Sequence, residues 1–294
     1  MIITGDDVDG ISTLKASLHH TFEMKDLGSL SYFLDLEVIS SDDGIYLSQT
    51  KYAFDLLARV GITNSRTEST SLEPNLVGGL VYLTVTRPDF AYPFHVLIQF
   101  LLAPRTTHYA AVLRILRYIK GTLFHGLYFS AHSSLSLQAY SDADWAGDPT
   151  DRRSTTGYCL FLGDALISWR AKKQTFTARS STEAEYRALA DTTAEVISVR
   201  WLLADLGAPQ SSPTDVLCDN RSAIQIAHND VFHERTKHIE IDCHFVRQRI
   251  LIDAIRLIAV GTLDQTADIF TKAHHPTRFQ TLLSKLKLVS LAPT

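Results

Sequence analysis

The chain has 294 residues, of which 45% are hydrophobic and 20% are charged, and its formal net charge is -4. This composition is that of an ordinary globular protein and leaves room for two modest domains. The chain has no run of about 18 uncharged apolar residues, so we expect no membrane-spanning helix. The acidic balance argues mildly against nucleic-acid binding, although the local clustering of Lys and Arg matters more than the sum.

The cysteines indicate a reducing environment. Cys159, Cys218 and Cys243 are odd in number and show no CxxC or Cys/His zinc spacing. We interpret them as reduced, mostly buried thiols of an intracellular protein. Residues 1–7 have neither a basic region nor a long apolar run, so we expect no signal peptide and no secretion.

The first half of the chain mixes strand and helix patterns. In chain order they predict a strand at residues 1–4, a helix at 14–22, two strands at 32–38 and 44–47, and a helix at 52–60 that Gly61 ends. Residues 65–75 are polar and predict a linker, and residues 76–102 are strongly apolar.

Residues 109–119 predict an amphipathic helix. Val112, Ile115, Leu116 and Ile119 share its apolar face. The opposite face is basic and carries Arg114, Arg117 and Lys120. The sequence leaves two interpretations open for that face, a solvated surface or a nucleic-acid contact.

The chain becomes polar and rich in small residues at 131–134, and we place the domain boundary there, dividing residues 1–133 from 134–294. Beyond it the patterns predict strands at 135–142, 157–162 and 165–169, a long helix at 182–206, a strand at 216–218, helices at 221–227 and 239–250, a strand at 255–260 and a helix beginning at 267–272. This order predicts an α/β (α+β mixed) fold, a mixed five-stranded sheet with helices on its faces.

Acidic residues stand at the ends of these predicted elements. They are Asp142, Glu185, Asp219 and Asp268. In an open α/β sheet, strand ends and helix starts converge on one rim. Carboxylate oxygens are the ligands that a hard cation such as Mg²⁺ prefers. Four of them could hold two ions about 4 Å apart, one activating a water and one stabilising the leaving oxygen in phosphoryl transfer.

Each of these residues also has a structural alternative that the sequence leaves open. The alternatives are a capping box of Thr182 with Glu185, turn caps by Asp142 and Asp144, a helix N-cap by Asp219 and Asn220, and a helix-dipole role for Asp268.

Several ordered stretches resemble the end of the Pol polyprotein of copia-type retrotransposons, the reverse transcriptase–ribonuclease H region. They are residues 140–147 (Tyr-Ser-Asp-Ala-Asp-Trp-Ala-Gly), 152–159, 168–169, 172–174, 179–186 (Arg-Ser-Ser-Thr-Glu-Ala-Glu-Tyr), 218–220 (Cys-Asp-Asn), 235–242 and 265–272 (Gln-Thr-Ala-Asp-Ile-Phe-Thr-Lys). The resemblance covers nearly the whole chain and is far more specific than any single motif.

The resemblance implies a ribonuclease H fold with an Asp-Glu-Asp-Asp metal site for two Mg²⁺ ions, with Mn²⁺ as the alternative. Matching motif positions put that site on Asp142, Glu185, Asp219 and Asp268. We prefer Glu185 to Glu183 because Glu185 directly precedes the Tyr-Arg-Ala-Leu run, and Asp144 is the runner-up at the first position.

Cellular members of the wider superfamily carry a His in the loop before the last Asp. Residues 260–265 contain none, so the proton-shuttling role is unassigned. We interpret His238 and His244, on or near the preceding helix, as structural residues.

Residues 1–133 resemble the last palm strands, thumb and connection of the same family's reverse transcriptase. The family's catalytic Asp-Asp pair lies just upstream of the Ile-Ile-Thr-Gly strand, so we interpret these residues as a truncated segment without that motif. Asp6 and Asp7 are then expected in a solvated turn. The family usually has extra residues before the Leu-Val-Gly-Gly-Leu stretch at 76–80, and we interpret this copy as internally shortened.

The implied activity is metal-dependent hydrolysis of the RNA strand of an RNA–DNA hybrid, leaving 3′-hydroxyl and 5′-phosphate ends. Asp142 would contact both ions, Glu185 and Asp219 one, and Asp268 the other. We expect contacts to the backbone and the 2′-hydroxyls, with little sequence preference. Candidate phosphate contacts are Arg153, Lys172, Lys173, Arg179 and Arg221.

The sequence leaves four alternatives to this activity. An inactive retrotransposon remnant fits the truncation, whereas a polymerase would need the missing Asp-Asp pair. An integrase-like nuclease would need a different acidic order and a zinc module, and a pure hybrid-binding module would lack the carboxylates. We expect an intracellular location, in the cytoplasm within a virus-like particle or in the nucleus, with other Pol regions as candidate partners and no membrane partner.

Overall fold

A computed structural model describes residues 2–3, 5, 7–22, 26, 28–61, 74–103, 105–229 and 239–291. The first elements are α1 (Val8–Thr21), β1 (Tyr32–Phe33), β2 (Leu36–Ser41), β3 (Gly44–Ser48), α2 (Thr50–Arg59), α3 (Pro74–Leu83), the 3-10 helix η1 (Pro88–Phe90), α4 (Ala91–Ile98), α5 (Thr106–Gly121) and β4 (His125–Ser130). They are followed by β5 (Leu137–Ala143), β6 (Thr155–Leu162), β7 (Ala165–Lys173), α6 (Ser181–Asp205), β8 (Thr214–Cys218), α7 (Arg221–His228), α8 (Glu240–Leu251), β9 (Ile255–Ala259), the 3-10 helix η3 (Thr266–Phe270), α9 (Pro276–Lys285) and β10 (Val289–Ser290).

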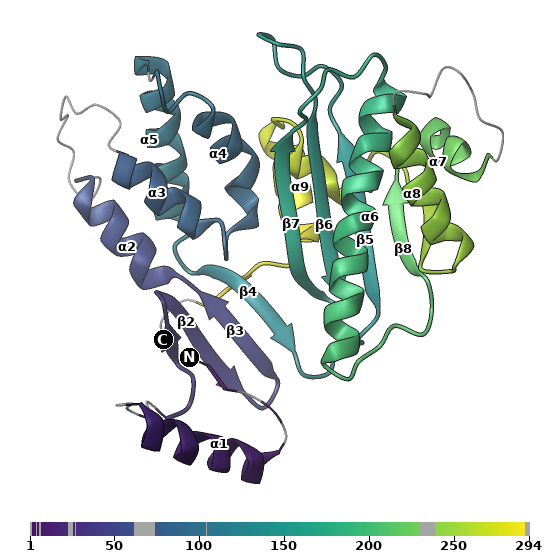
Figure 1. Ribbon diagram of the computed structural model, residues 1–294. Coiled ribbons are helices and arrows are strands. Elements are labelled where there is room, and N and C mark those ends of the chain that lie inside the picture. Colours follow the sequence, from purple (N-terminus) through teal and green to yellow (C-terminus); the bar gives the residue numbers. More distant parts are fainter. Residues whose placement is uncertain are drawn as a thin grey trace.

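Two five-stranded sheets organise these elements, with the orders β1-β2-β3-β4-β10 and β7-β6-β5-β8-β9 (Figure 1). In the second sheet β5, β6 and β7 are antiparallel, whereas β8 runs parallel to both β5 and β9. One face packs against α6, α7 and α8, and the other against η3, α9 and the first sheet. This confirms the predicted α/β fold, a mixed five-stranded sheet with helices on its faces.

The amphipathic helix is confirmed as α5, in which Val112, Ile115, Leu116 and Ile119 are all buried. Two strand predictions need correction. Ile2 and Ile3 lie in irregular chain, and the strand predicted at 32–38 is broken into β1 and β2 because Leu34 and Asp35 adopt positive φ values of 47° and 58°. The strands β4 and β10 were not predicted. Most of the predicted linker at 65–75 lies outside the described residues.

The two sheets share a core. Leu127 and Phe129 of β4 pack in one cluster with Phe161 of β6 and Phe270 of η3. At the same junction, the indole N–H of Trp169 donates to the carbonyl of Thr84 at 3.2 Å. The chain then returns to the first sheet, where β10 pairs with β4. We propose two units divided at 131–134. The strand β10 follows the second unit in sequence but pairs with β4 in the sheet of the first unit.

No described helix is long and apolar enough to cross a membrane. All three cysteines are free and buried, as their spacing predicts.

The shared core predicts that the second unit depends on the first for stability. A segment of residues 134–294 on its own would expose the apolar surface that β4 covers and would leave β10 unpaired. We expect its guanidinium unfolding midpoint, followed by tryptophan fluorescence, to lie below that of the same unit in the full chain. Equal midpoints would contradict this expectation and would mark the junction as energetically neutral.

Candidate metal centre

Asp142 and Asp219 reach the same edge of the second sheet because their strands are parallel neighbours. Tyr140 of β5 pairs with Leu217 of β8, so each carboxylate stands two residues beyond this pair. Asp142, with 2% of its surface exposed, is the penultimate residue of β5, and Asp219 directly follows β8. The convergence is the one expected where parallel strands end.

Glu185 is not the capping residue of its helix. Ser180 is the N-cap of α6 and accepts from the amide of Glu183 at 3.2 Å, while Glu183 accepts from the amide of Arg179 at 2.8 Å. The cap is therefore formed by Ser180, and Glu183 accepts from the residue before it. The alternative that gave this role to Glu185 is wrong, and the Glu185 side chain is left to face the sheet.

Glu185 is buried beside the thiol of Cys218 and the carboxylate of Asp219. The residue is 6% exposed, and the thiol of Cys218 donates to its Oε2 with an Sγ···Oε2 distance of 3.9 Å. The start of α6 is held near β6 by the buried Gln174, whose amide donates to the carbonyl of Ala184 at 2.9 Å and to the hydroxyl of Thr156 at 3.1 Å. Gln174 was part of a recognised motif, but its positioning role follows only from the structure.

The residue that caps α7 is Asn220 and not Asp219. Asn220 is the N-cap of α7, and its side-chain oxygen accepts from the amide of Ala223 at 3.0 Å. Asp219 takes no part in this cap. Its Oδ2 accepts from the hydroxyl of Thr262 at 3.2 Å, which links it to the loop before η3.

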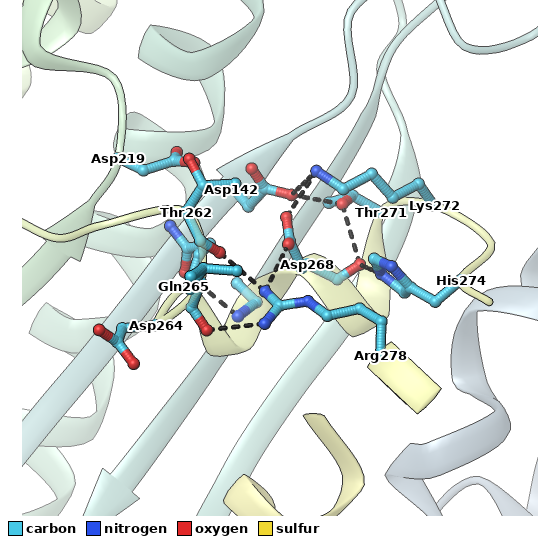
Figure 2. A network of polar contacts seen from close by, with 12 residues as sticks. Asp142, Asp219, Thr262, Asp264, Gln265, Asp268, Thr271, Lys272, His274 and Arg278 are labelled. Carbon is cyan, nitrogen blue, oxygen red and sulfur yellow. Dashed lines mark hydrogen bonds and ion pairs between the residues drawn. The ribbon is translucent and has the colours of Figure 1, made fainter. Parts of the chain in front are cut away.

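Asp268 lies in the short 3-10 helix η3, not at the start of an α-helix as predicted, and is 2% exposed. Figure 2 shows its carboxylate between two cations. The Lys272 ammonium lies 2.5 Å from Oδ1, and the Arg278 guanidinium lies 2.9 Å from Oδ2. The carboxylate is therefore engaged by side-chain charges, which the helix-dipole alternative did not include.

Lys272 also reaches Asp142, with an Nζ···Oδ2 distance of 3.8 Å, and the hydroxyl of Thr271 donates to the same oxygen (Figure 2). The close approach of η3 to the sheet depends on Gly157, which pairs with Asp142 in the ladder. A Cβ at Gly157 would lie 2.5 Å from Cγ2 of Thr271 and 2.9 Å from Cβ of Phe270. Glycine is therefore required there for steric reasons.

Burial of like charges shifts the pKa values of this cluster. Burial raises the pKa of Asp142 to about 7, with Asp268 and Asp219 adding to the rise and Lys272 opposing it. Burial also raises the pKa of Glu185 to about 10, and the Asp142 and Asp219 carboxylates add to it. Burial lowers the pKa of Lys272, but Asp142 and Asp268 outweigh that effect, so the ammonium stays charged.

The donor set suits a divalent cation. Within the described part of the chain, Glu185, Cys218 and Asp219 form a group whose ligand atoms lie within 4.8 Å of one another. Asp142 and Asp268 instead share the Lys272 ammonium. Carboxylate oxygens are the ligands that a hard cation prefers. In this structure the positive charge beside Asp142 and Asp268 is the Lys272 ammonium.

The runner-up Asp144 is turned to the main chain, where its carboxylate accepts from the amide of Thr155. Lys173 is engaged by carboxylates of Asp148 at 2.5 Å and Asp151 at 2.8 Å, which weakens its case as a phosphate contact. His244 is exposed on α8, whereas His238 lies outside the described residues.

At the other end of the chain, Asp7 is the N-cap of α1 rather than part of a turn, and Asp6 lies outside the described residues. Arg278 and Thr262 carry no motif that points to the site, and sequence reasoning missed both.

Comparisons with known proteins place the chain in a family. A family model described as reverse transcriptase (RNA-dependent DNA polymerase) matches residues 1–74. The retrovirus-related Pol polyprotein from transposon RE1 of Arabidopsis thaliana is 40% identical over all of this chain, which covers 21% of that protein. An uncharacterized mitochondrial protein of the same plant is 43% identical over 67% of this chain and 89% of its own length. The chain belongs to the copia-type retrotransposon Pol family.

Other Pol relatives agree with this assignment. The Pol polyprotein from transposon TNT 1-94 of Nicotiana tabacum is 34% identical over 95% of this chain and 23% of its own length. The chain thus spans about a fifth of the length of these Pol relatives.

Among solved structures, LC11-RNase H1 in complex with an RNA/DNA hybrid covers 46% of this chain and 94% of its own, with 9% identity and a TM-score of 0.35. The foamy viral protease-reverse transcriptase with dsDNA covers 89% and 53%, with 12% identity and a TM-score of 0.46.

The raised pKa of Glu185 predicts a pH-dependent stability in the metal-free protein. Between the unfolded pKa near 4.5 and the folded pKa of about 10, the folded chain binds a proton that the unfolded chain releases. The free energy of unfolding should therefore fall as pH rises, by up to about 1.4 kcal/mol per pH unit for one proton.

We expect Glu185→Gln to flatten this slope in guanidinium titrations at pH 6 and pH 7.5 with EDTA. The matched Glu183→Gln should keep the slope and lose up to about 1 kcal/mol of stability at both pH values, because it removes the ion pair of Glu183 with Arg187 at 3.0 Å. Parallel slopes for the wild type and Glu185→Gln would show that Glu185 does not hold a proton in the folded chain over this pH range.

Proposed function

We propose that this chain is a metal-dependent endonuclease that hydrolyses the RNA strand of an RNA–DNA hybrid. The observation that carries the proposal is the convergence of Asp142, Glu185, Asp219 and Asp268 at one edge of the second sheet. They come from a strand end, the first turns of a helix, a second strand end and a 3-10 helix. Membership of the retrotransposon Pol family supports a nucleic-acid substrate.

In this proposal the four carboxylates hold two Mg²⁺ ions, with Mn²⁺ as a substitute. Asp142 is central, because the Asp268 and Asp219 carboxylates both help to raise its pKa, and its own carboxylate helps to raise the pKa of Glu185. Glu185 and Asp219 serve one ion, and Asp268 serves the other. When bound, the ions supply an activated water and stabilise charge on the leaving oxygen.

The surrounding side chains orient these ligands. The Thr271 hydroxyl fixes the Asp142 carboxylate, and the Thr262 hydroxyl fixes that of Asp219. Arg278 holds Asp268 at 2.9 Å and also donates to the carbonyls of Leu263 and Thr262 at 2.7 Å. Outer contacts of this kind keep metal ligands in their productive geometry.

Recognition of the hybrid is proposed to rest on its backbone and 2′-hydroxyl groups, with little sequence preference. The exposed side chains of Lys172, Arg179 and Arg221 are the stronger candidates for phosphate contact. Lys173 and Arg153 are weaker, because both pair with carboxylates of the loop at 148–151.

The test is cleavage of an end-labelled RNA–DNA hybrid by the full chain, with Mg²⁺ and with EDTA. Asp219→Asn should lower the rate by more than about 100-fold, since losing an outer-shell partner alone typically costs 10- to 100-fold. The matched control is Asp215→Asn on the same strand, whose carboxylate is engaged by Arg256 at 2.7 and 2.9 Å away from the cluster.

Metal-dependent cutting of the RNA strand that Asp219→Asn removes and Asp215→Asn retains is the expected result. Hybrid binding without cleavage, by a folded chain with either Mg²⁺ or Mn²⁺, would replace the nuclease by a binding module. Neither binding nor cleavage would favour an inactive retrotransposon remnant.

A further inference from the structure

Side-chain cations are unevenly distributed around the candidate metal centre. On one side, both carboxylate oxygens of Asp268 are paired with cations, Lys272 at 2.5 Å and Arg278 at 2.9 Å. On the other side, Glu185 and Asp219 contact a thiol at 3.9 Å and a hydroxyl at 3.2 Å, neither of which is charged. Within the described part of the chain, neither Glu185 nor Asp219 forms an ion pair, so these two carboxyl groups are not already occupied by a side-chain cation.

Lys272 bridges two of the four carboxylates. Its ammonium lies between Asp142, at 3.8 Å, and Asp268, at 2.5 Å (Figure 2). The backbone amide of Lys272 donates to the carbonyl of Asp268 at 3.4 Å, which holds the two residues on the same turn. The ammonium would repel a divalent ion on the same two carboxylates, because like charges a few ångströms apart interact strongly in a partly buried site.

We propose that Lys272 is an internal cation that fills the Asp142–Asp268 half of the centre. On this basis, the chain without substrate binds one divalent ion, on the side of Glu185 and Asp219. A second ion enters only by displacing Lys272. This inference rests on the proposed function for the identity of the centre, and it adds an order of ion binding and a positioning role for Lys272.

The displaced side chain has room to move. Lys272 lines a cavity of about 440 Å³ between η3–α9 and the helices α4 and α5, and its side chain is 41% exposed. The carboxylate of Asp89 in that cavity is already engaged by the buried Arg87 at 2.7 Å and by the hydroxyl of Tyr118 at 2.7 Å. The cavity therefore accepts the ammonium without offering it a free carboxylate, and the return of Lys272 to Asp268 stays favourable when the second ion leaves.

The experiment is a titration of the metal-free full chain with Mn²⁺, in which free Mn²⁺ is counted by electron paramagnetic resonance. We expect one bound ion per wild-type chain in the concentration range of the first site. Lys272→Met should bind two, with the second ion at least about tenfold tighter than in the wild type, because one positive charge has been removed beside its ligands. Two ions close together should also broaden the bound Mn²⁺ spectrum.

Two variants serve as controls. Lys272→Arg keeps the charge and should keep the single-ion behaviour. Lys285→Met makes the same substitution at a lysine that contacts Asp264 at 3.1 Å and the carbonyl of Leu263 at 2.8 Å, outside the four carboxylates, and should titrate like the wild type. Thermal unfolding of each variant with and without Mn²⁺ checks that it is folded.

The outcomes separate this inference from the proposed function. No bound ion in either the wild type or Lys272→Met would remove the metal centre itself and the proposed function with it. Two ions of similar affinity in the wild type, or one ion in both proteins, would overturn the role of Lys272 and leave the nuclease proposal standing. If Lys272→Met is unfolded, the wild-type stoichiometry alone decides, and two tight ions contradict the inference.

Discussion

Buried like charge is the constraint on which this half of the molecule depends. Asp142, Glu185 and Asp268 are each at most 6% exposed, and burial raises the pKa of the first two. A fold gains no stability from gathering acids in this way, since desolvation and mutual repulsion both oppose it. The free-energy cost of burying these acids is one that cation binding would offset. Many of the surrounding side chains accordingly hold the carboxyl groups in place or neutralise their charge.

The balance is achieved largely from one short segment. The 3-10 helix η3 and the residues after it contribute Asp268, Thr271, Lys272 and, from α9, Arg278. Its approach to the sheet requires the missing side chain of Gly157. A structural change at any of these residues would move the carboxylates. The end of β5 and η3 therefore act as a single structural unit, although more than 100 residues separate them in sequence.

Sequence reasoning located what periodicity and local chemistry encode. The apolar stripe of α5 and the βββαβ order could be predicted because burial of one helix face or strand face leaves a regular pattern. β10 spans only two residues and exists because β4 is available as a partner, a tertiary fact with no local signal. The cap at Ser180 competed with an equally good pattern two residues later, and only the observed hydrogen bonds separate them.

The acidic net charge also has a different meaning once the centre is considered. Four of the acidic residues form the carboxylate cluster, and several basic residues nearby are already neutralised, as Lys173 is by Asp148 and Asp151. Two divalent ions would bring the formal net charge from -4 to neutrality. For a chain that must approach a polyanion, metal binding then does more than supply the chemistry: it removes the local negative potential that would otherwise repel the substrate at the site of reaction.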